Sequence, residues 1–467
     1  MKRYIFAFIV LLSVEFLAGC SKSFMDLAPY DALPVQTALR TESDMENAVN
    51  GMYASMRNTD LFGRSIPFIN DLMADNVMLS TNNSGRYLLH NTYTVNPQDS
   101  YASGIWRRGY YTILAANNII NADIESNPAI EQFKGEAHAV RALVYFYLLQ
   151  TFATPYSVDP GALGVPISLS YDPQLTIGRN TVSEGYALIV DDLKTAYSLM
   201  TQERSSAFAS KYFAQGLLAK VYLHMGDTQN ALLAGQDVID HGGYSLVDAG
   251  ALNAYWNNPE PESTKRETIF EITNDAVNNA GWDALAGMYE QSGYGDGVAN
   301  PELYALYRTT DARKGLILEG ERGGVPALFI NKYQNYANAS NKDNVKILRY
   351  ADVLLITAEA AAREGQEAQA RAILNELVTK RDPSFAGYTS TGDELVADII
   401  EERRKELAFE GDRLMDLNRL QLPIVRTAEG YAPGTALIPA GDGRRILPIP
   451  QDEIDANGLI DQNEAYK

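Results

Sequence analysis

Hydrophobic residues recur every three to four positions along most of the chain, a spacing that places them on one face of an α-helix. The pattern predicts helices at residues 43–56, 106–122, 131–152, 181–200, 210–225, 229–241, 350–364, 367–380 and 393–419. Thr181, with Glu184 three residues later, fits a capping box that begins one of them. The expected fold class is therefore mostly α.

Two segments lack this spacing. Between residues 245 and 345 Gly, Asn, Pro and aromatic residues dominate, and short strands are predicted near 267–273 and 327–332. Residues 57–104 are predicted to be irregular, and the proline-containing tail from 421 to 467 is predicted to run extended. We expect a single domain at 41–467, with a helical scaffold at about 41–244 and 346–420, a loop-rich insertion at about 245–345, and an extended tail.

Two of the predicted helix pairs carry small residues at matching offsets. The positions are Ala219, Gly226 and Ala231 in one pair, and Ala358, Gly365 and Ala370 in the other. Small residues let two antiparallel helices approach closely, and the glycine allows the turn between them, as in tetratricopeptide (TPR) repeats. We expect a TPR-like scaffold interrupted by the insertion, although two generic helical hairpins would show the same pattern.

The N-terminus has the layout of a secretory signal peptide. A short basic start precedes an apolar run at residues 4–14, which is too short to span a bilayer. The following Leu17-Ala18-Gly19-Cys20 resembles a bacterial lipobox. We expect residues 1–19 to be removed, Cys20 to be lipidated, and residues 20–40 to form a tether and extended lead-in. An ordinary signal peptide with an incidental cysteine is the alternative.

Composition and motifs narrow the function classes. The chain has 39 Lys+Arg against 59 Asp+Glu, a net charge of −20, which disfavours nucleic-acid binding. Its single cysteine excludes an intramolecular disulfide and a Cys-built metal site. We find no zincin, nucleophile-elbow, Walker A or EF-hand motif. We therefore expect no catalytic residue, no metal site and no cofactor. A structural Ca²⁺ ion and a pair of catalytic carboxylates both remain open.

Residues 401–413 are dense in charges of both signs. Helical spacing suggests the pairs Glu401–Lys405 and Glu410–Arg413, but each exposed pair of this kind contributes only about 0.2–0.5 kcal/mol. That is too little to account for so many charges. We interpret the segment as a structural network that joins this helix to its neighbours rather than as a functional site.

Five motifs, in order along the chain, resemble those of the SusD/RagB family, surface lipoproteins of Bacteroidetes-type bacteria. They are Ala116-Asn117-Asn118-Ile119-Ile120, Glu136-Ala137 with Arg141-Ala142, Leu348-Arg349-Tyr350-Ala351-Asp352-Val353, Glu402-Arg403-Arg404-Lys405-Glu406-Leu407 with Glu410-Gly411, and Leu447-Pro448-Ile449-Pro450 with Gln462-Asn463. Glu464 and Ala465 depart from the family's C-terminal motif, which usually has Pro and Gly at these positions.

The resemblance implies TPR-like repeats packed against an irregular region. It also implies an outer-membrane location facing the cell exterior, with the lipid on Cys20 as the membrane contact. A SusC-like TonB-dependent outer-membrane barrel is the implied partner, and an oligosaccharide is the implied ligand. Peptide capture, as in RagB, a purely structural lid subunit and a surface glycosidase are the alternatives.

The family motifs do not identify the ligand residues, so these are sought among aromatic and polar residues outside the helices. Sugar rings stack on exposed aromatic faces, and amides, carboxylates and guanidinium groups bind the hydroxyls at their rim. Two stretches have this mixture, and from them we select the candidates Asn83, Arg86, Tyr87, Tyr101, Trp282, Tyr289 and Tyr294. Trp282 and Tyr294 are preferred, because neighbouring glycines are expected to leave both rings exposed. Alternatively, these rings pack the loops onto the scaffold.

Overall fold

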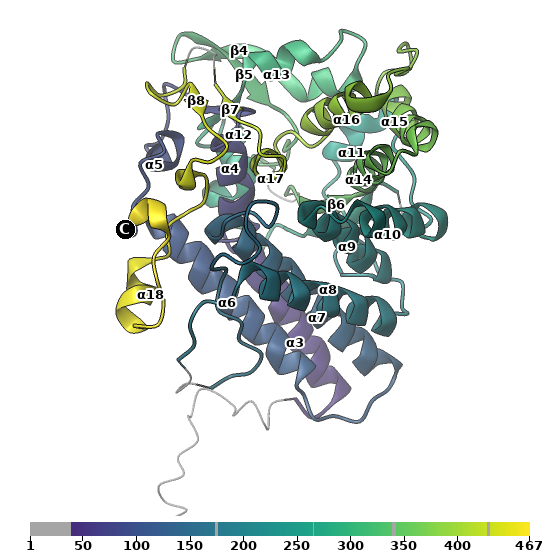
Figure 1. The fold of residues 1–467 in the computed structure, drawn as a ribbon. Coiled ribbons are helices and arrows are strands. Elements are labelled where there is room, and N and C mark those ends of the chain that lie inside the picture. Colours follow the sequence, from purple (N-terminus) through teal and green to yellow (C-terminus); the bar gives the residue numbers. More distant parts are fainter. Residues whose placement is uncertain (1–38, 173–175, 265, 339–341, 427–429) are drawn as a thin grey trace, which may run out of the picture.

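A computed structural model describes residues 39–172, 176–264, 266–338, 342–426 and 430–467. The signal peptide and Cys20 lie outside the described residues. In Figure 1, helices packed side by side fill the lower part and the right of the molecule, and short strands gather in the upper part.

The helices of the scaffold agree with the predicted segments to within six residues at each end, except for the last predicted segment, 393–419, of which the last of these helices covers only the first part. Its helices are α3 (Glu42–Met56), α6 (Ser100–Ile120), α7 (Pro128–Phe152), α8 (Val182–Leu199), α9 (Lys211–Met225), α10 (Thr228–His241), α14 (Tyr350–Arg363), α15 (Glu367–Arg381) and α16 (Gly392–Glu406). The predicted capping box of Thr181 and Glu184 is present at the start of α8.

The two predicted helix pairs are α9–α10 and α14–α15. Gly226 (φ +79°) and Gly365 (φ +75°) follow the first helix of each pair in the left-handed conformation, which glycine adopts without strain. The pairs pack against each other through α10 and α14. The fold is mostly α and TPR-like, and the interruption in sequence does not separate the repeats in space.

Short elements complete the fold. The strands pair antiparallel as β1 (Val77–Leu79) with β3 (Gly297–Ala299), β2 (Thr268–Ile272) with β6 (Val345–Arg349), β4 (Ile317–Arg322) with β5 (Val325–Ile330), and β7 (Ile424–Val425) with β8 (Leu437–Ile438). The short helices are η2 (Ala249–Ala251), α11 (Leu252–Trp256), η3 (Gly281–Asp283), α12 (Leu285–Tyr289), α13 (Pro301–Leu306) and η4 (Ala312–Leu316). Strands β2 and β5 confirm the two predicted strand positions.

Three local predictions are wrong. Residues 57–104 are not irregular throughout, because they contain α4 (Ser65–Leu72), β1 and α5 (Leu88–Asn91). All eight residues of α4 are buried, and the helix spans only about two turns, which is too short for a helical repeat to stand out in the sequence. The predicted helix at 393–419 is two helices, since α16 ends at Glu406 and α17 (Arg413–Arg419) follows a turn in which Phe409 has φ +70° and Gly411 φ +87°.

The tail is not simply extended either. It contains β7, β8, η5 (Gly443–Arg445), α18 (Gln451–Ala456) and η6 (Glu464–Tyr466). Its end is tied to the scaffold by Asn463, whose Nδ2 donates to the carbonyl oxygens of Phe152 and Leu447 at 2.9 Å. The Phe152 carbonyl lies at the end of α7, where the helix supplies no further N–H, so the Asn463 amide satisfies it.

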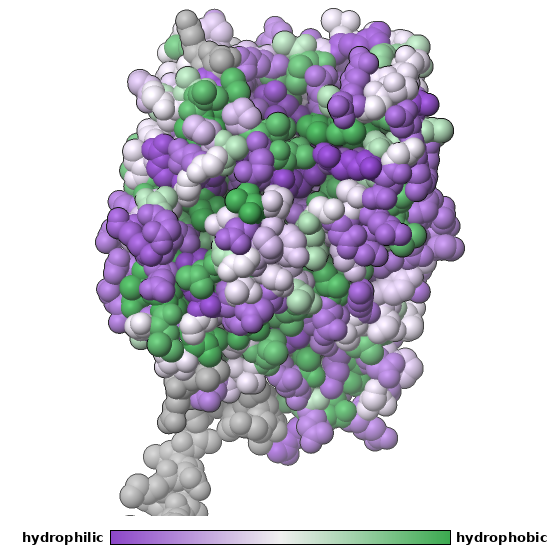
Figure 2. All heavy atoms as spheres, viewed as in Figure 1, coloured by the Kyte–Doolittle hydropathy of each residue, from purple (hydrophilic) through white to green (hydrophobic). Residues whose placement is uncertain are grey.

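One main cluster of buried hydrophobic side chains runs from Met45 in α3 to Ile460 in the tail. Helix α7 lies in the middle of it, packed against α6 and α8, and most of its residues are buried. Among the described helices, none combines the length and apolarity needed to cross a bilayer. Figure 2 shows hydrophobic and hydrophilic side chains interspersed over the visible face.

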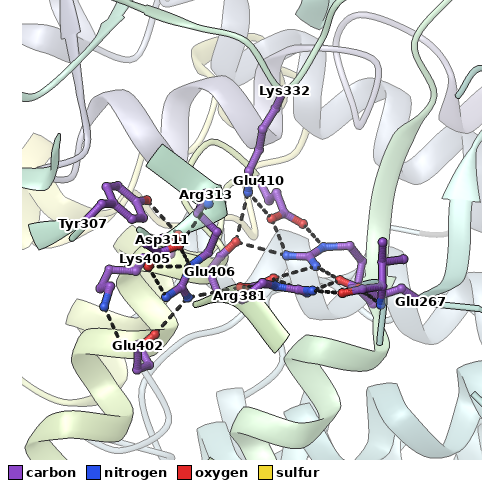
Figure 3. A network of polar contacts seen from close by, with 12 residues as sticks. Glu267, Tyr307, Asp311, Arg313, Lys332, Arg381, Glu402, Lys405, Glu406 and Glu410 are labelled. Atoms are coloured by element: carbon purple, nitrogen blue, oxygen red, sulfur yellow. Dashed lines mark hydrogen bonds and ion pairs between the residues drawn. The ribbon is translucent and has the colours of Figure 1, made fainter. Parts of the chain in front are cut away.

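The charges of residues 401–413 are largely buried, and most pair with side chains from other elements (Figure 3). Glu406 lies between arginines at 2.9–3.2 Å, namely Arg313, Arg349 and Arg381. Glu410 pairs with Lys332 and Arg349, each at 2.7 Å. The predicted structural network is confirmed.

The individual pairs suggested by helical spacing are wrong. Lys405 pairs with Glu402 at 2.5 Å rather than with Glu401. Arg413 pairs with Asp75 in the loop after α4, at 2.7 Å, rather than with Glu410. Lys405 pairs with the other glutamate that helical spacing places within its reach, because Glu402 is buried beside it whereas Glu401 is exposed. Arg413 follows the break after α16, so its partner lies on another element.

The network predicts that stability falls in acid. Neighbouring cations hold the pKa of Glu406 and Glu410 below the ordinary value, so their contribution is present above about pH 4 and is lost as pH falls further. Burial lowers the pKa of His90 to about 4 and that of His224 well below the ordinary value, so their contribution declines below about pH 6.5. Burial raises the pKa of Asp412 to about 6, which opposes part of this loss.

We therefore expect the melting temperature to decline gently below pH 6.5 and steeply below about pH 4. Thermal unfolding followed by circular dichroism between pH 3 and 8 measures this. A melting temperature that stayed constant or rose down to pH 3 would contradict it.

Candidate functional site

The two sequence stretches with candidate ligand residues meet in space. The first contributes Arg86, which precedes α5, and the second contributes Tyr294, which precedes β3. The guanidinium of Arg86 lies over the Tyr294 ring, 3.8 Å from its centroid, and Nη2 donates to the Tyr294 hydroxyl at 2.8 Å. β1 and β3, which pair with each other, bring these two segments together.

Trp282 is the most exposed ring of this region. It lies on η3 with 59% of its surface exposed, and it packs edge-to-face on Tyr294 and Tyr336 at centroid distances of 5.6 and 6.2 Å. Tyr101, half-buried at the start of α6, lies nearby on the Arg86 side. We call the group Trp282, Tyr294, Tyr336, Arg86 and Tyr101 the aromatic face.

Two acidic side chains hold the loops that carry this face. Asp283 accepts hydrogen bonds from Arg64 Nη1 at 3.0 Å and from the Tyr294 hydroxyl at 3.3 Å. The buried carboxylate of Asp296 binds the backbone N–H of Ser84 at 2.8 Å and also the Ser84 hydroxyl. Charge-assisted bonds of this kind hold both loops in place, so the rings are positioned before any ligand arrives.

Two candidate residues do not face solvent. Tyr87 is 2% exposed and stacks beneath Tyr101 at 4.0 Å, with its hydroxyl bonded to Arg64 and Ser65. Tyr289 is fully buried and stacks on Tyr333 at 5.7 Å. A ring without an exposed face cannot stack on a sugar, so for these two residues the packing interpretation holds.

Asn83 is partly exposed, but its amide is already engaged. Its Nδ2 donates to the carbonyl of Ser80 at 2.7 Å, and its Oδ1 accepts from the backbone N–H of Gly85 at 2.9 Å. These bonds form the turn itself, as asparagine often does in loops. We therefore assign Asn83 to holding the turn next to the face.

Tyr336, Arg64 and Asp283 belong to the site but were not among the candidates. Tyr336 lies in an Asn-rich part of the insertion, so its composition could have indicated it. Arg64 and Asp283 carry no such signal, because their role depends on the meeting of segments more than 200 residues apart in sequence.

The described residues include no group of three or more His, Cys, Asp or Glu side chains placed to hold a metal ion. His138 instead contacts Asp192 at 2.6 Å within the helical scaffold. His90 is fully buried behind the stacked pair of Tyr87 and Tyr101. These histidines therefore belong to the packing of the protein.

Two family models match the chain. One, described as starch-binding associating with outer membrane, matches residues 23–223, and the SusD family model matches residues 319–466. SusD-like protein P2 of Formosa agariphila is 29% identical over 524 residues, covering 100% of both chains. The crystal structure of a SusD superfamily protein from Bacteroides vulgatus has a TM-score of 0.85 at 29% identity and covers 92% of this chain and 100% of its own. That of a SusD superfamily protein from Bacteroides thetaiotaomicron has a TM-score of 0.83 at 28% identity and covers 91% of this chain and 99% of its own.

Proposed function

The chain belongs to the SusD/RagB family, and we propose that it is a non-catalytic protein that captures oligosaccharides at the cell surface. It delivers them to a SusC-like TonB-dependent barrel in the outer membrane. The lipid on Cys20 anchors it there, facing the cell exterior. The observation that supports ligand capture is the exposed, braced ring of Trp282 within the aromatic face.

The chemistry of this face suits a sugar. The C–H side of a pyranose ring matches the flat surface of Trp282, and the burial of both apolar faces favours binding. Arg86, which covers one side of the Tyr294 ring, and the Tyr294 hydroxyl place polar groups next to Trp282, where the hydroxyl groups of a stacked sugar would lie. Because Asp283 already holds the Tyr294 hydroxyl, binding would lose less side-chain conformational entropy.

Replacing Trp282 or Tyr294 by Ala is expected to weaken oligosaccharide binding at least about tenfold, which corresponds to about 1.4 kcal/mol. Each substitution removes a stacking surface while leaving the scaffold intact. Isothermal titration calorimetry against a panel of oligosaccharides measures the effect. Tyr171→Ala is the matched control, because Tyr171 is 61% exposed and does not belong to the aromatic face.

Other outcomes separate the alternatives. If calorimetry detected binding of peptides but of no oligosaccharide, the protein would be assigned to peptide capture instead of glycan capture. Unchanged affinity in both Ala variants would move the binding site elsewhere. Uptake that survives both substitutions but not deletion of the protein would indicate a structural lid, and release of reducing sugar by the purified protein would indicate a glycosidase.

A further inference from the structure

A shallow depression of about 460 Å³ lies beside the aromatic face. It is formed by the end of α3, the loop after it, one side of α6 and the loop that leads into η3. Its polar lining includes Arg57, Asn58, Arg108, Asn278, Asn279 and Asp283. Asp283 connects the depression to the aromatic face, because it lines the depression, follows Trp282 directly in the chain and accepts a hydrogen bond from the Tyr294 hydroxyl.

Two arginines in the depression have guanidinium groups without a carboxylate partner. Arg57 donates through Nε to the carbonyl of Thr273 at 2.5 Å, and its other nitrogens make no hydrogen bond within the described chain. Arg108 lies 5.0 Å from the Tyr111 ring centroid and forms no ion pair among the described residues. In contrast, the buried Arg313, Arg349 and Arg381 each pair with carboxylates.

The nearby acids are occupied by other groups. Asp275 accepts from the backbone N–H groups of Val277 and Asn278 and from the Asn278 side chain at 2.6–3.0 Å. Asp283 is held by Arg64 at 3.0 Å. Partial burial lowers the pKa of Arg57, and Asp275 offsets this only in part. Among the described residues, no carboxylate therefore lies in ion-pair contact with either arginine, although Asp275 acts on Arg57 from a greater distance.

We propose that this depression binds an acidic substituent, a carboxylate or a sulfate ester, so that the captured glycan is an acidic oligosaccharide. The inference rests on the proposed function and specifies its ligand class. Guanidinium groups match planar oxyanions with paired N–H donors, and the side-chain amide of Asn58, whose Oδ1 accepts from the backbone N–H of Asp60, adds a donor at the rim. The side-chain amides of Asn278 and Asn279 donate within their own loop and hold its shape. A sugar stacked on Trp282 would direct a substituent into this depression.

The test compares glycans that differ only in charge. Tetragalacturonate is compared with its methyl ester, and a sulfated carrageenan tetrasaccharide with its desulfated form, by calorimetry at 50 and 300 mM NaCl. We expect the acidic member of at least one pair to bind about tenfold or more tightly than its neutral counterpart, with the preference reduced at high salt. Arg57→Gln and Arg108→Gln are each expected to remove most of that preference.

Arg107→Gln is the matched control, since it removes the same charge from the neighbouring position of α6 but lines a different depression, beside Trp106 and Glu453. Preference for the carboxylate pair or for the sulfate pair supports the inference and identifies the acidic group. Equal affinity for acidic and neutral glycans, or an equal effect of Arg107→Gln, overturns the inference and leaves the proposed function standing. Absence of binding to any glycan overturns both.

Discussion

Replacing Arg349 by Met is expected to lower the free energy of unfolding by about 3–5 kcal/mol. Arg349 is 1% exposed and joins three carboxylates, with Glu267 at 2.5 Å, Glu406 at 3.0 Å and Glu410 at 2.7 Å. Met fills a similar volume but provides no charge and no hydrogen bond. The carboxylates would stay buried with fewer partners, and that uncompensated charge is the source of the loss.

The loss can be measured by urea denaturation of the mature protein. Arg363→Met is the control, because Arg363 also pairs with a glutamate, Glu359, but is 36% exposed. A pair of this kind contributes at most about 1 kcal/mol. Equal losses in the two variants would mean that the buried network does not hold the insertion to the scaffold.

Replacing Gly411 by Ala is expected to lower the free energy of unfolding by about 3 kcal/mol, from backbone strain and overpacking together. Gly411 has φ +87°, and a Cβ there would lie 2.5 Å from the backbone Cα of Pro67 in α4. The backbone cannot move away easily, because the Gly411 N–H donates to Asp71 at 2.8 Å. Both the turn and its contact with α4 would be distorted.

Gly392→Ala separates the two causes. Gly392 has φ +56°, but a Cβ there would meet nothing within 4 Å, so this substitution causes strain without a clash. We expect it to cost about 1 kcal/mol. Thermal unfolding of both variants measures the difference, and a Gly411→Ala protein as stable as Gly392→Ala would show that α17 can shift away from α4 at little cost.

The family motifs lie far apart in sequence but meet in the structure. Arg349, from the motif that begins α14, pairs with Glu406 and Glu410 from the motif of α16 and the turn after it. Arg141 of α7 donates to Asn117 of α6 at 2.7 Å, which joins two more motifs. These residues specify how helices pack, which explains why the motifs predicted the fold but did not identify ligand residues.

The candidate site was predictable only in part. Loop composition indicated both segments of the aromatic face, and glycine neighbours correctly favoured Trp282 as an exposed ring. Composition could not separate Tyr294, which belongs to the face, from Tyr289, which packs behind it, because both lie in the same loop-rich stretch. The side on which each ring lies depends on β1 pairing with β3, a contact between distant segments.

The sequence by itself determined the helices, their pairing around Gly226 and Gly365, and the family, because helical spacing, caps and left-handed glycines act over a few residues. Tertiary structure decided the break in the helix near Gly411, the partners of the buried charges and the composition of the aromatic face. Each of these depends on which distant segment displaces water from a side chain, and that competition is settled only when the whole chain has packed.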